Sequence, residues 1–191
     1  MFLDQTVDGT SGHFSFAGFR VEAVRFQHVA MTRHDSDDIA LLKTALSAVD
    51  RITGAGFADH AYGNDGKDMF SGDAGKDMIR GGKGNDAIFG DAGRDRLEGG
   101  LGTDALTGDT GADSFVFIVG EIDDDRVTDF ELGVDTLALD VADPSLPLMD
   151  RPVVAHDITG GVRFDFDNGD VLTVLGVGVT KAGLMDQIGL S

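Results

Sequence analysis

The sequence has no cysteine, few basic residues and no long apolar run, and each shortage removes a class of function. Without cysteine, the chain can form neither disulfides nor thiolate metal sites. Its 15 lysine and arginine residues face 34 aspartate and glutamate residues, which leaves a formal net charge of −19. This charge repels nucleic-acid phosphates and favours cations as partners. No stretch of about 18 apolar residues occurs and the start, MFLDQTVDGTSG, lacks a Sec signal pattern, so neither a membrane span nor Sec export is predicted.

Glycine, in contrast, is abundant and recurs with a period of nine residues. The segment 63–116 reads GNDGKDMFS, GDAGKDMIR, GGKGNDAIF, GDAGRDRLE, GGLGTDALT and GDTGADSFV without an insertion. In every copy, glycine occupies positions one and four, aspartate position six and a large apolar residue position eight. A degenerate copy, GAGFADHAY at 54–62, precedes them with Phe57 in place of the second fixed glycine. This order indicates a repeated structural unit and not a flexible linker.

Each repeat predicts a tight turn followed by a short strand. The two fixed glycines allow positive φ angles and close backbone approach, so main-chain carbonyls can point at an ion. Because side chains alternate along a strand, the residue at position eight faces inwards while positions seven and nine, such as Arg96 and Arg80, face outwards. Two repeats complete one coil, and successive coils lie about 4.8 Å apart. The odd repeats therefore stack along one edge and the even repeats along the other.

The aspartates at position six then form two ladders of like charge. The ladders are Asp68, Asp86 and Asp104 on one edge, and Asp59, Asp77, Asp95 and Asp113 on the other. Ca²⁺ takes about six to eight oxygen ligands, carboxylates and carbonyls among them, whereas Mg²⁺ demands a smaller octahedral site. The pattern predicts a roll whose folding depends on calcium. The alternative, in which aspartates only cap the turns, does not explain why position six is never Asn or Ser.

The pattern G-[GND]-x-G-x-D-x-U-x, where U is a large apolar residue, resembles the RTX nonapeptide repeat. The resemblance implies an all-β fold, a calcium-bound parallel β-roll, in which each ion lies between repeat n and repeat n+2. It also implies the ligands of each ion. Carbonyls of positions two and four and the aspartate of the first repeat join carbonyls of positions one and three and the aspartate of the second.

In this sequence, the resemblance implies about four calcium ions, or five or more. The first site takes Asn64, Gly66, Asp68, Gly81, Lys83 and Asp86. The second takes Asp73, Gly75, Asp77, Gly90, Ala92 and Asp95. The third takes Gly82, Gly84, Asp86, Gly99, Leu101 and Asp104. The fourth takes Asp91, Gly93, Asp95, Gly108, Thr110 and Asp113. A fifth would use Asp59, Gly72, Ala74 and Asp77, although Phe57 interrupts the motif there.

The flanks predict a cap at each end of the roll, which divides the chain into an N-terminal cap at 1–53, the calcium roll at 54–116 and a C-terminal β cap at 117–191. In the first cap, HFSFAGFRVEAVRF predicts a hairpin around Ala17-Gly18. An amphipathic helix is predicted after it by the spacing of Ile39, Leu42, Leu46 and Val49. This helix either covers the first open coil or binds a partner.

After the repeats, the segments FVFIVG, RVTDFELGVDTLALDV and GVRFDFDNGDVLTVLGV predict strands, and a helix is predicted at 180–188. Asn168-Gly169 predicts a hairpin turn between the last two strands. The acidic residues here either close a further calcium site or form a solvated loop; they are Asp123, Asp124, Asp125 and Asp129. This region resembles the C-terminal cap of serralysin-type proteases, which implies export by the type I secretion machinery and an extracellular location.

The sequence offers no motif for catalysis. There is no HExxH, no GxSxG and no Walker A loop, and the five histidines are scattered singly. The leading hypothesis is therefore a secreted, monomeric, non-catalytic module that folds on calcium. The chain also resembles the R-modules of mannuronan C5-epimerases, which implies an alternative role in binding an extracellular polysaccharide. Under that alternative, the contacts would be Lys67, Lys76, Lys83 and Arg94.

Overall fold

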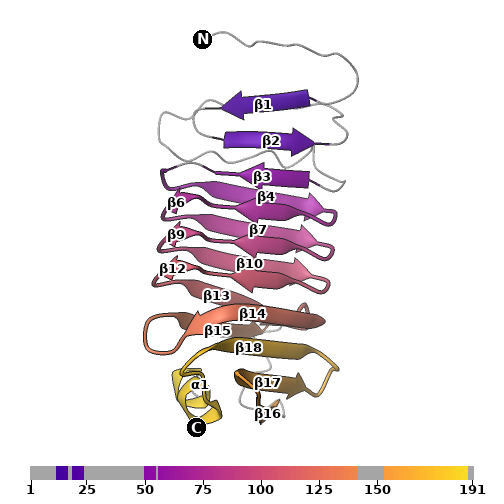
Figure 1. Ribbon diagram of the computed structural model, residues 1–191. Helices are drawn as coiled ribbons and strands as arrows, with labels where there is room; N and C mark the ends of the chain where they lie inside the picture. The colour runs from indigo at the N-terminus through magenta and orange to yellow at the C-terminus, as the bar shows by residue number, and fades with distance from the viewer. Residues whose placement is uncertain (1–11, 17–18, 24–49, 55, 142–152, 189–191) are drawn as a thin grey trace.

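A computed structural model of the protein describes residues 12–16, 19–23, 50–54, 56–141 and 153–188. Strands stack as successive coils along one axis, from β1 at one end to β16, β17 and α1 at the other (Figure 1). The prediction of an all-β parallel roll is confirmed. The predicted helix around Ile39 to Val49 lies outside the described residues. No helix in the described part of the chain is long and apolar enough to cross a membrane.

The coils place their strands in two facing parallel sheets, named here after the repeats that supply them. The odd sheet contains β3 (Asp50–Thr53), β5 (Met69–Ser71), β8 (Ala87–Phe89), β11 (Ala105–Thr107) and β14 (Asp124–Glu131). The even sheet contains β4 (His60–Asp65), β7 (Met78–Lys83), β10 (Arg96–Leu101), β13 (Ser114–Val119) and β15 (Thr136–Val141). Phe70 pairs with Ile88 and Ile79 with Leu97, so one coil corresponds to two repeats, as predicted. A third sheet, at the edge formed by the even repeats, contains β6 (Ala74–Gly75), β9 (Ala92–Gly93) and β12 (Thr110–Gly111).

The backbone conformation of the turn that begins each repeat explains which residue types occur at position two of the repeat. That position has a positive φ in every repeat: Asn64, Asp73, Gly82, Asp91, Gly100 and Asp109. Glycine, asparagine and aspartate tolerate this left-handed region best, which accounts for the restriction to these three types. The glycine at position four is required by close approach. At Gly84, whose φ is 132°, a Cβ atom would overlap the carbonyl oxygen of Gly66 in the neighbouring coil.

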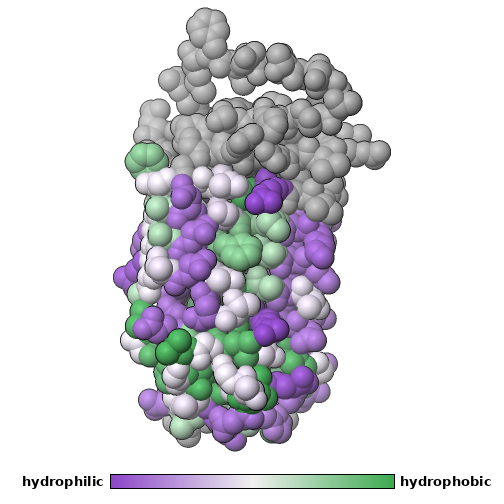
Figure 2. Space-filling model, in the orientation of Figure 1, coloured by the Kyte–Doolittle hydropathy of each residue, from purple (hydrophilic) through white to green (hydrophobic). Residues whose placement is uncertain are grey.

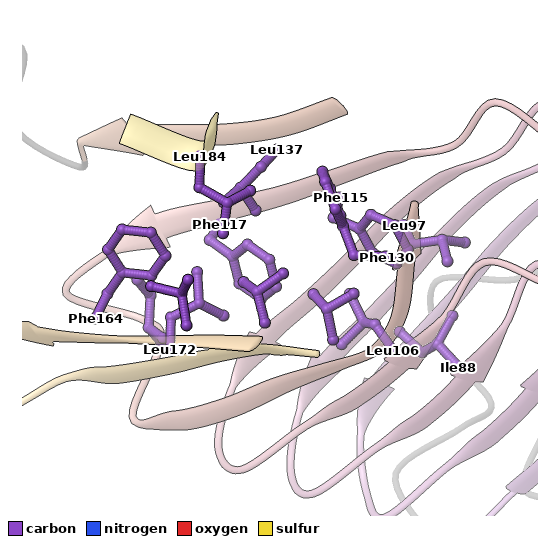
Figure 3. Close-up of a cluster of buried hydrophobic side chains, with 14 of the residues drawn as sticks. Ile88, Leu97, Leu106, Phe115, Phe117, Phe130, Leu137, Phe164, Leu172 and Leu184 are labelled. Carbon is purple, nitrogen blue, oxygen red and sulfur yellow. The ribbon is translucent and has the colours of Figure 1, made fainter. Parts of the chain in front are cut away.

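The residues at position eight form the core, as predicted. All six are at most 3% exposed: Phe70, Ile79, Ile88, Leu97, Leu106 and Phe115. Figure 3 shows four of them, Ile88, Leu97, Leu106 and Phe115, between the two sheets, and Leu184 of the C-terminal helix in the same cluster. The rings of Phe115 and Phe130 pack at a centroid distance of 5.8 Å. On the outside, hydrophilic residues run along both margins of the face seen in Figure 2, with less polar residues between them.

The parallel stacking does not end at the last nonapeptide. Strand β14 pairs in parallel with β11, and β15 pairs in parallel with β13. Val127 and Leu137, which are 0% and 3% exposed, take the inward positions of these added strands. The run predicted as RVTDFELGVDTLALDV is thus two strands in opposite sheets, because the chain turns between Leu132 and Asp135.

Each end of the roll carries antiparallel strands. At the start, β1 (Gly12–Phe16) pairs with β2 (Phe19–Ala23), which confirms the predicted hairpin, and β2 pairs with β3. At the other end, β18 (Val171–Val177) pairs in parallel with β14 and antiparallel with β17 (Gly161–Phe166), through the predicted turn at Asn168-Gly169. Strand β16 (Val153–Ile158) completes this sheet and was not predicted. Helix α1 (Lys181–Gln187), with Thr180 as its N-cap, confirms the predicted helix.

Candidate calcium sites along two aspartate ladders

The aspartates at position six stack in two ladders, and hydrogen bonds connect their rungs. In each bond the main-chain N–H of one aspartate donates to Oδ1 of the ladder aspartate 18 residues further on, at 2.8–2.9 Å. The donor and acceptor pairs are Asp59 with Asp77, Asp68 with Asp86, Asp77 with Asp95, Asp86 with Asp104 and Asp95 with Asp113. Since these bonds fix each side chain against the preceding coil, the carboxylates of neighbouring coils are held close together.

The other carboxylate oxygen, Oδ2, is buried and makes no hydrogen bond within the described part of the chain. This holds for Asp77, Asp86, Asp95, Asp104, Asp113 and Asp125. A buried polar atom without a partner costs free energy, and a buried charge without a counter-charge costs more. The row of unsatisfied oxygens is therefore a row of positions where a cation would be stabilised.

The glycines at position one show that other oxygens face the same space. A Cβ atom built on Gly81 would meet Oδ2 of Asp86 and the main-chain oxygen of Gly99, one coil further on. Gly63, Gly72 and Gly90 have the equivalent neighbours in their own coils. A side chain here would fill the space between a carboxylate and a carbonyl, so only glycine leaves that space open. Mixed carboxylate and carbonyl oxygens are the donor set that Ca²⁺ prefers, so the residues present fit this ion.

No three side chains of His, Cys, Asp or Glu converge on one point among the residues that the structure describes. Each candidate site instead draws on two ladder carboxylates from adjacent coils and on main-chain oxygens. The side chains of Lys83, Leu101 and Thr110 are exposed, so these residues could contribute only their carbonyls. Lys83 Nζ pairs with Oδ1 of Asp65 at 3.3 Å on the surface.

Burial raises the pKa values of the ladder carboxyls. Desolvation is the largest cause, and like charges on neighbouring rungs add to it, while the hydrogen bond from the preceding rung lowers the pKa. The pKa rises to about 7 for Asp77 and to about 6 for Asp104 and Asp113. It rises to about 9 for Asp125, the most deeply placed of these groups. At neutral pH without a cation, Asp125 would stay mostly protonated and Asp77 about half protonated, whereas Asp104 and Asp113 would ionise less readily than a free aspartate.

The structure adds two rungs that the sequence motif did not identify. Asp104 N–H donates to Oδ1 of Asp125 at 2.8 Å, across 21 residues, and Asp113 N–H donates to Oδ1 of Asp135 at 2.9 Å, across 22 residues. Because these spacings exceed 18 residues, a strict period of nine does not identify either rung. One signal remains in the sequence, because each added aspartate is followed two residues later by an inward apolar residue, Val127 or Leu137.

The other three acidic residues named in the sequence lie outside the ladders: Asp123 and Asp124 are exposed and Asp129 is half-buried. Asp123, in a left-handed turn, accepts a 2.9 Å hydrogen bond from Gly102 N–H through Oδ2. Asp129 accepts hydrogen bonds from the main-chain N–H groups of Gly108 and Asp109. Asp124 is exposed. Of the four residues named in the sequence, only Asp125 is buried in a ladder.

The basic residues considered for polysaccharide contact do not share one surface. Lys76 and Arg94 belong to even repeats and lie at the edge that β6 and β9 occupy. Lys67 and Lys83 belong to odd repeats, whose turns lie at the opposite edge. The roll therefore divides these four residues into two separate pairs.

Comparison with known proteins agrees with the repeat unit. The family described as the RTX calcium-binding nonapeptide repeat matches residues 45–79 and 80–115. A search of curated protein sequences gave no match.

Two solved structures are similar to this chain at low sequence identity. The extracellular lipase LipA from Serratia marcescens is 18% identical with a TM-score of 0.36, and the match covers 74% of this chain but only 38% of the lipase chain. The AlgE6R3 subunit of the Azotobacter vinelandii mannuronan C5-epimerase is 19% identical with a TM-score of 0.43, covering 84% of this chain and 87% of that one. Residues 45–115 are thus similar to the RTX calcium-binding nonapeptide repeat, and they form the stacked coils of a parallel β-roll.

Proposed function

We propose that this protein is a non-catalytic module whose folding depends on calcium binding, and that it acts outside the cell after type I secretion. The observation that carries the proposal is the row of buried Oδ2 atoms without hydrogen bonds along both ladders. Each of these atoms is stabilised if a divalent ion lies between neighbouring rungs. Because the ion binds the stacked coils and not the unfolded chain, calcium would shift the equilibrium towards the folded roll.

The proposed ions lie between repeats n and n+2, at the four ligand sets given by the motif. Asp86 and Asp95 are interior rungs, and each would serve two ions. Asp68, Asp77, Asp104 and Asp113 would each serve one ion of the four. The N-terminal segment 1–53 and the C-terminal segment 117–191 would act as caps, since antiparallel strands close each end of the stack.

Coupling to calcium suits a protein that folds after export. Extracellular calcium modules bind with Kd values of about 10⁻⁴–10⁻³ M. At such affinities the ladders would stay charged and unfolded where calcium is scarce, and the coils would order where calcium is abundant. Polysaccharide binding is not favoured by the geometry. Lys76 and Arg94 share their edge with Asp73 and Asp91, so that edge offers a polyanion little net attraction.

The test is circular dichroism of the full chain with calcium added and then chelated. We expect β-structure to appear with millimolar calcium and to be lost on chelation. Asp95→Asn should raise the calcium concentration needed at the midpoint at least several-fold, because it removes a ligand from two ions. Asp109→Asn is the matched control, since Asp109 is exposed and lies outside the ladders. Identical spectra with and without calcium would refute the proposal.

A further inference from the structure

The two ladders continue past the nonapeptides, but they end differently. On the odd edge the last rung is Asp125, and on the even edge it is Asp135. Both lie beyond residues 80–115, the last part of the chain that matches the repeat family. Both accept a hydrogen bond through Oδ1 from the preceding rung. The difference lies in the second carboxylate oxygen.

At the odd edge, Asp125 repeats the geometry of the rungs inside the motif. Its side chain is 0% exposed, its Oδ1 accepts the N–H of Asp104 at 2.8 Å, and its Oδ2 has no hydrogen-bond partner within the described residues. The Oδ2 of Asp104, one coil earlier, is also buried and has no hydrogen-bond partner within the described residues. Two buried carboxylates of adjacent coils therefore each have one unsatisfied oxygen.

A small hollow next to Asp125 has a mixed lining. Its polar residues are Glu98 and Glu121, and the rest of its lining is Gly100, Val116, Phe117, Ile118 and Ile122. Gly100 belongs to the turn that precedes Asp104, and a Cβ atom on Gly99 in that turn would meet Oδ2 of Asp104. The turn therefore keeps the close approach of glycine to the ladder carboxylate seen in the motif, although the coil from Asp104 to Asp125 is three residues longer than the coils within the motif.

At the even edge, both oxygens of the last rung are already satisfied by main-chain donors. Oδ1 of Asp135 accepts the N–H of Asp113 at 2.9 Å, and Oδ2 accepts the N–H of Glu131 at 2.8 Å. The main-chain oxygen of Asp135 is also used, because it accepts a 2.8 Å hydrogen bond from Nε2 of Gln187. A cation at this position would have to displace hydrogen bonds that the chain makes by itself.

We propose that Asp104 and Asp125 hold a calcium ion of their own, one coil beyond the nonapeptides, and that Asp113 and Asp135 hold none. This inference rests on the proposed calcium-dependent folding and extends it to a site outside the motif. The ion would join β11 to β14, and β14 pairs with β18. Asp170, just before β18, accepts the N–H of Gly120 at 2.6 Å in the same region. The site would therefore couple the C-terminal strands to calcium.

The test is to count bound calcium ions on the full chain at saturation, by equilibrium dialysis with metal analysis. We expect Asp125→Asn to bind one ion fewer than the unsubstituted protein. Asp135→Asn, a rung of the same ladder type, should bind the same number as the unsubstituted protein. Asp95→Asn should bind two fewer and serves as the reference for sites within the motif.

The outcomes separate this inference from the proposed function. Loss of ions in Asp95→Asn together with an unchanged number in Asp125→Asn would overturn the extra site alone. No calcium on the unsubstituted protein would overturn both. If Asp125→Asn fails to fold, anomalous scattering from a crystal of the unsubstituted protein grown with calcium decides the question. We expect a calcium peak between Asp104 and Asp125 and none between Asp113 and Asp135, and the reverse pattern would refute the assignment.

Discussion

The main-chain N–H of Asp86 donates a 2.8 Å hydrogen bond to Oδ1 of Asp104, the next rung of the same ladder. The two oxygens of the Asp104 carboxylate therefore have different roles. Oδ1 accepts the hydrogen bond that joins adjacent coils, and Oδ2 is buried without a hydrogen bond and could bind a cation. The aspartate at position six is thus both a structural residue and a candidate ligand, which explains why Ser, with no second oxygen, does not occur there.

Substitutions at Asp86 should separate these two tasks. Asp86→Asn keeps an oxygen that can accept the N–H of Asp68 but removes the anionic ligand. Asp86→Ala removes both, and the lost hydrogen bond adds about 0.5–1.5 kcal/mol of destabilisation. In saturating calcium, urea unfolding should therefore rank the unsubstituted protein above Asp86→Asn and Asp86→Ala last. Equal stability of the two variants would show that the bond between rungs contributes nothing.

The raised pKa values predict that protons can partly replace calcium. In the unfolded chain an aspartate has a pKa of about 3.9. In the metal-free roll the pKa is about 6 for Asp104 and Asp113, about 7 for Asp77 and about 9 for Asp125. The folded state thus binds protons more tightly, and this contribution to stability is fully present below pH ~4 and is lost as pH rises through 6–9.

Far-UV circular dichroism in a chelator should therefore show more β-structure near pH 5 than at pH 8. In saturating calcium the order should reverse, because the ion binds deprotonated carboxylates. A metal-free protein whose β-structure grows as pH rises from 5 to 8 would contradict this account. Asp104→Asn together with Asp113→Asn should weaken the metal-free pH dependence, since neither asparagine titrates.

The sequence predicted the fold where the period of nine was intact and missed features where it was not. The inward positions and the two ladders followed from the repeat alone, because one coil has a constant length. Asp125 and Asp135 were not recognised as rungs, because their coils are longer and only packing of Val127 and Leu137 restores the register. Strand β16 gave no signal because Ala155 is its only buried residue, so apolar and polar positions do not alternate.

Glycine positions that share a positive φ should differ sharply in their tolerance of alanine. Gly84 has a φ of 132°, and an added Cβ atom would overlap the main-chain oxygen of Gly66. Gly120 has a φ of 104° but nothing within 4 Å of the added atom. Gly120→Ala should cost about 1–2 kcal/mol from backbone strain alone, whereas Gly84→Ala must also push two coils apart. Calcium titration should give a much higher midpoint for Gly84→Ala, and equal midpoints would argue against close stacking.

The side chain of Gln187 closes the edge of the even sheet at β15. Its Oε1 accepts the N–H of Leu137 and its Nε2 donates to the carbonyl of Asp135, both at 2.8 Å, so the amide takes the place of a further coil. Gln187→Ala should therefore lower the free energy of unfolding by about 1–3 kcal/mol, the value of two hydrogen bonds.

The exposed neighbour Asp186 lies on the same helix and provides the control, because Asp186→Ala should change stability little. Losing the amide also leaves the N–H and carbonyl groups of β15 available to another strand, and unpaired edges promote association. Light scattering should consequently detect concentration-dependent association of Gln187→Ala in calcium. If Gln187→Ala and Asp186→Ala had the same stability and the same mass in solution, the two hydrogen bonds would not be what terminates the roll.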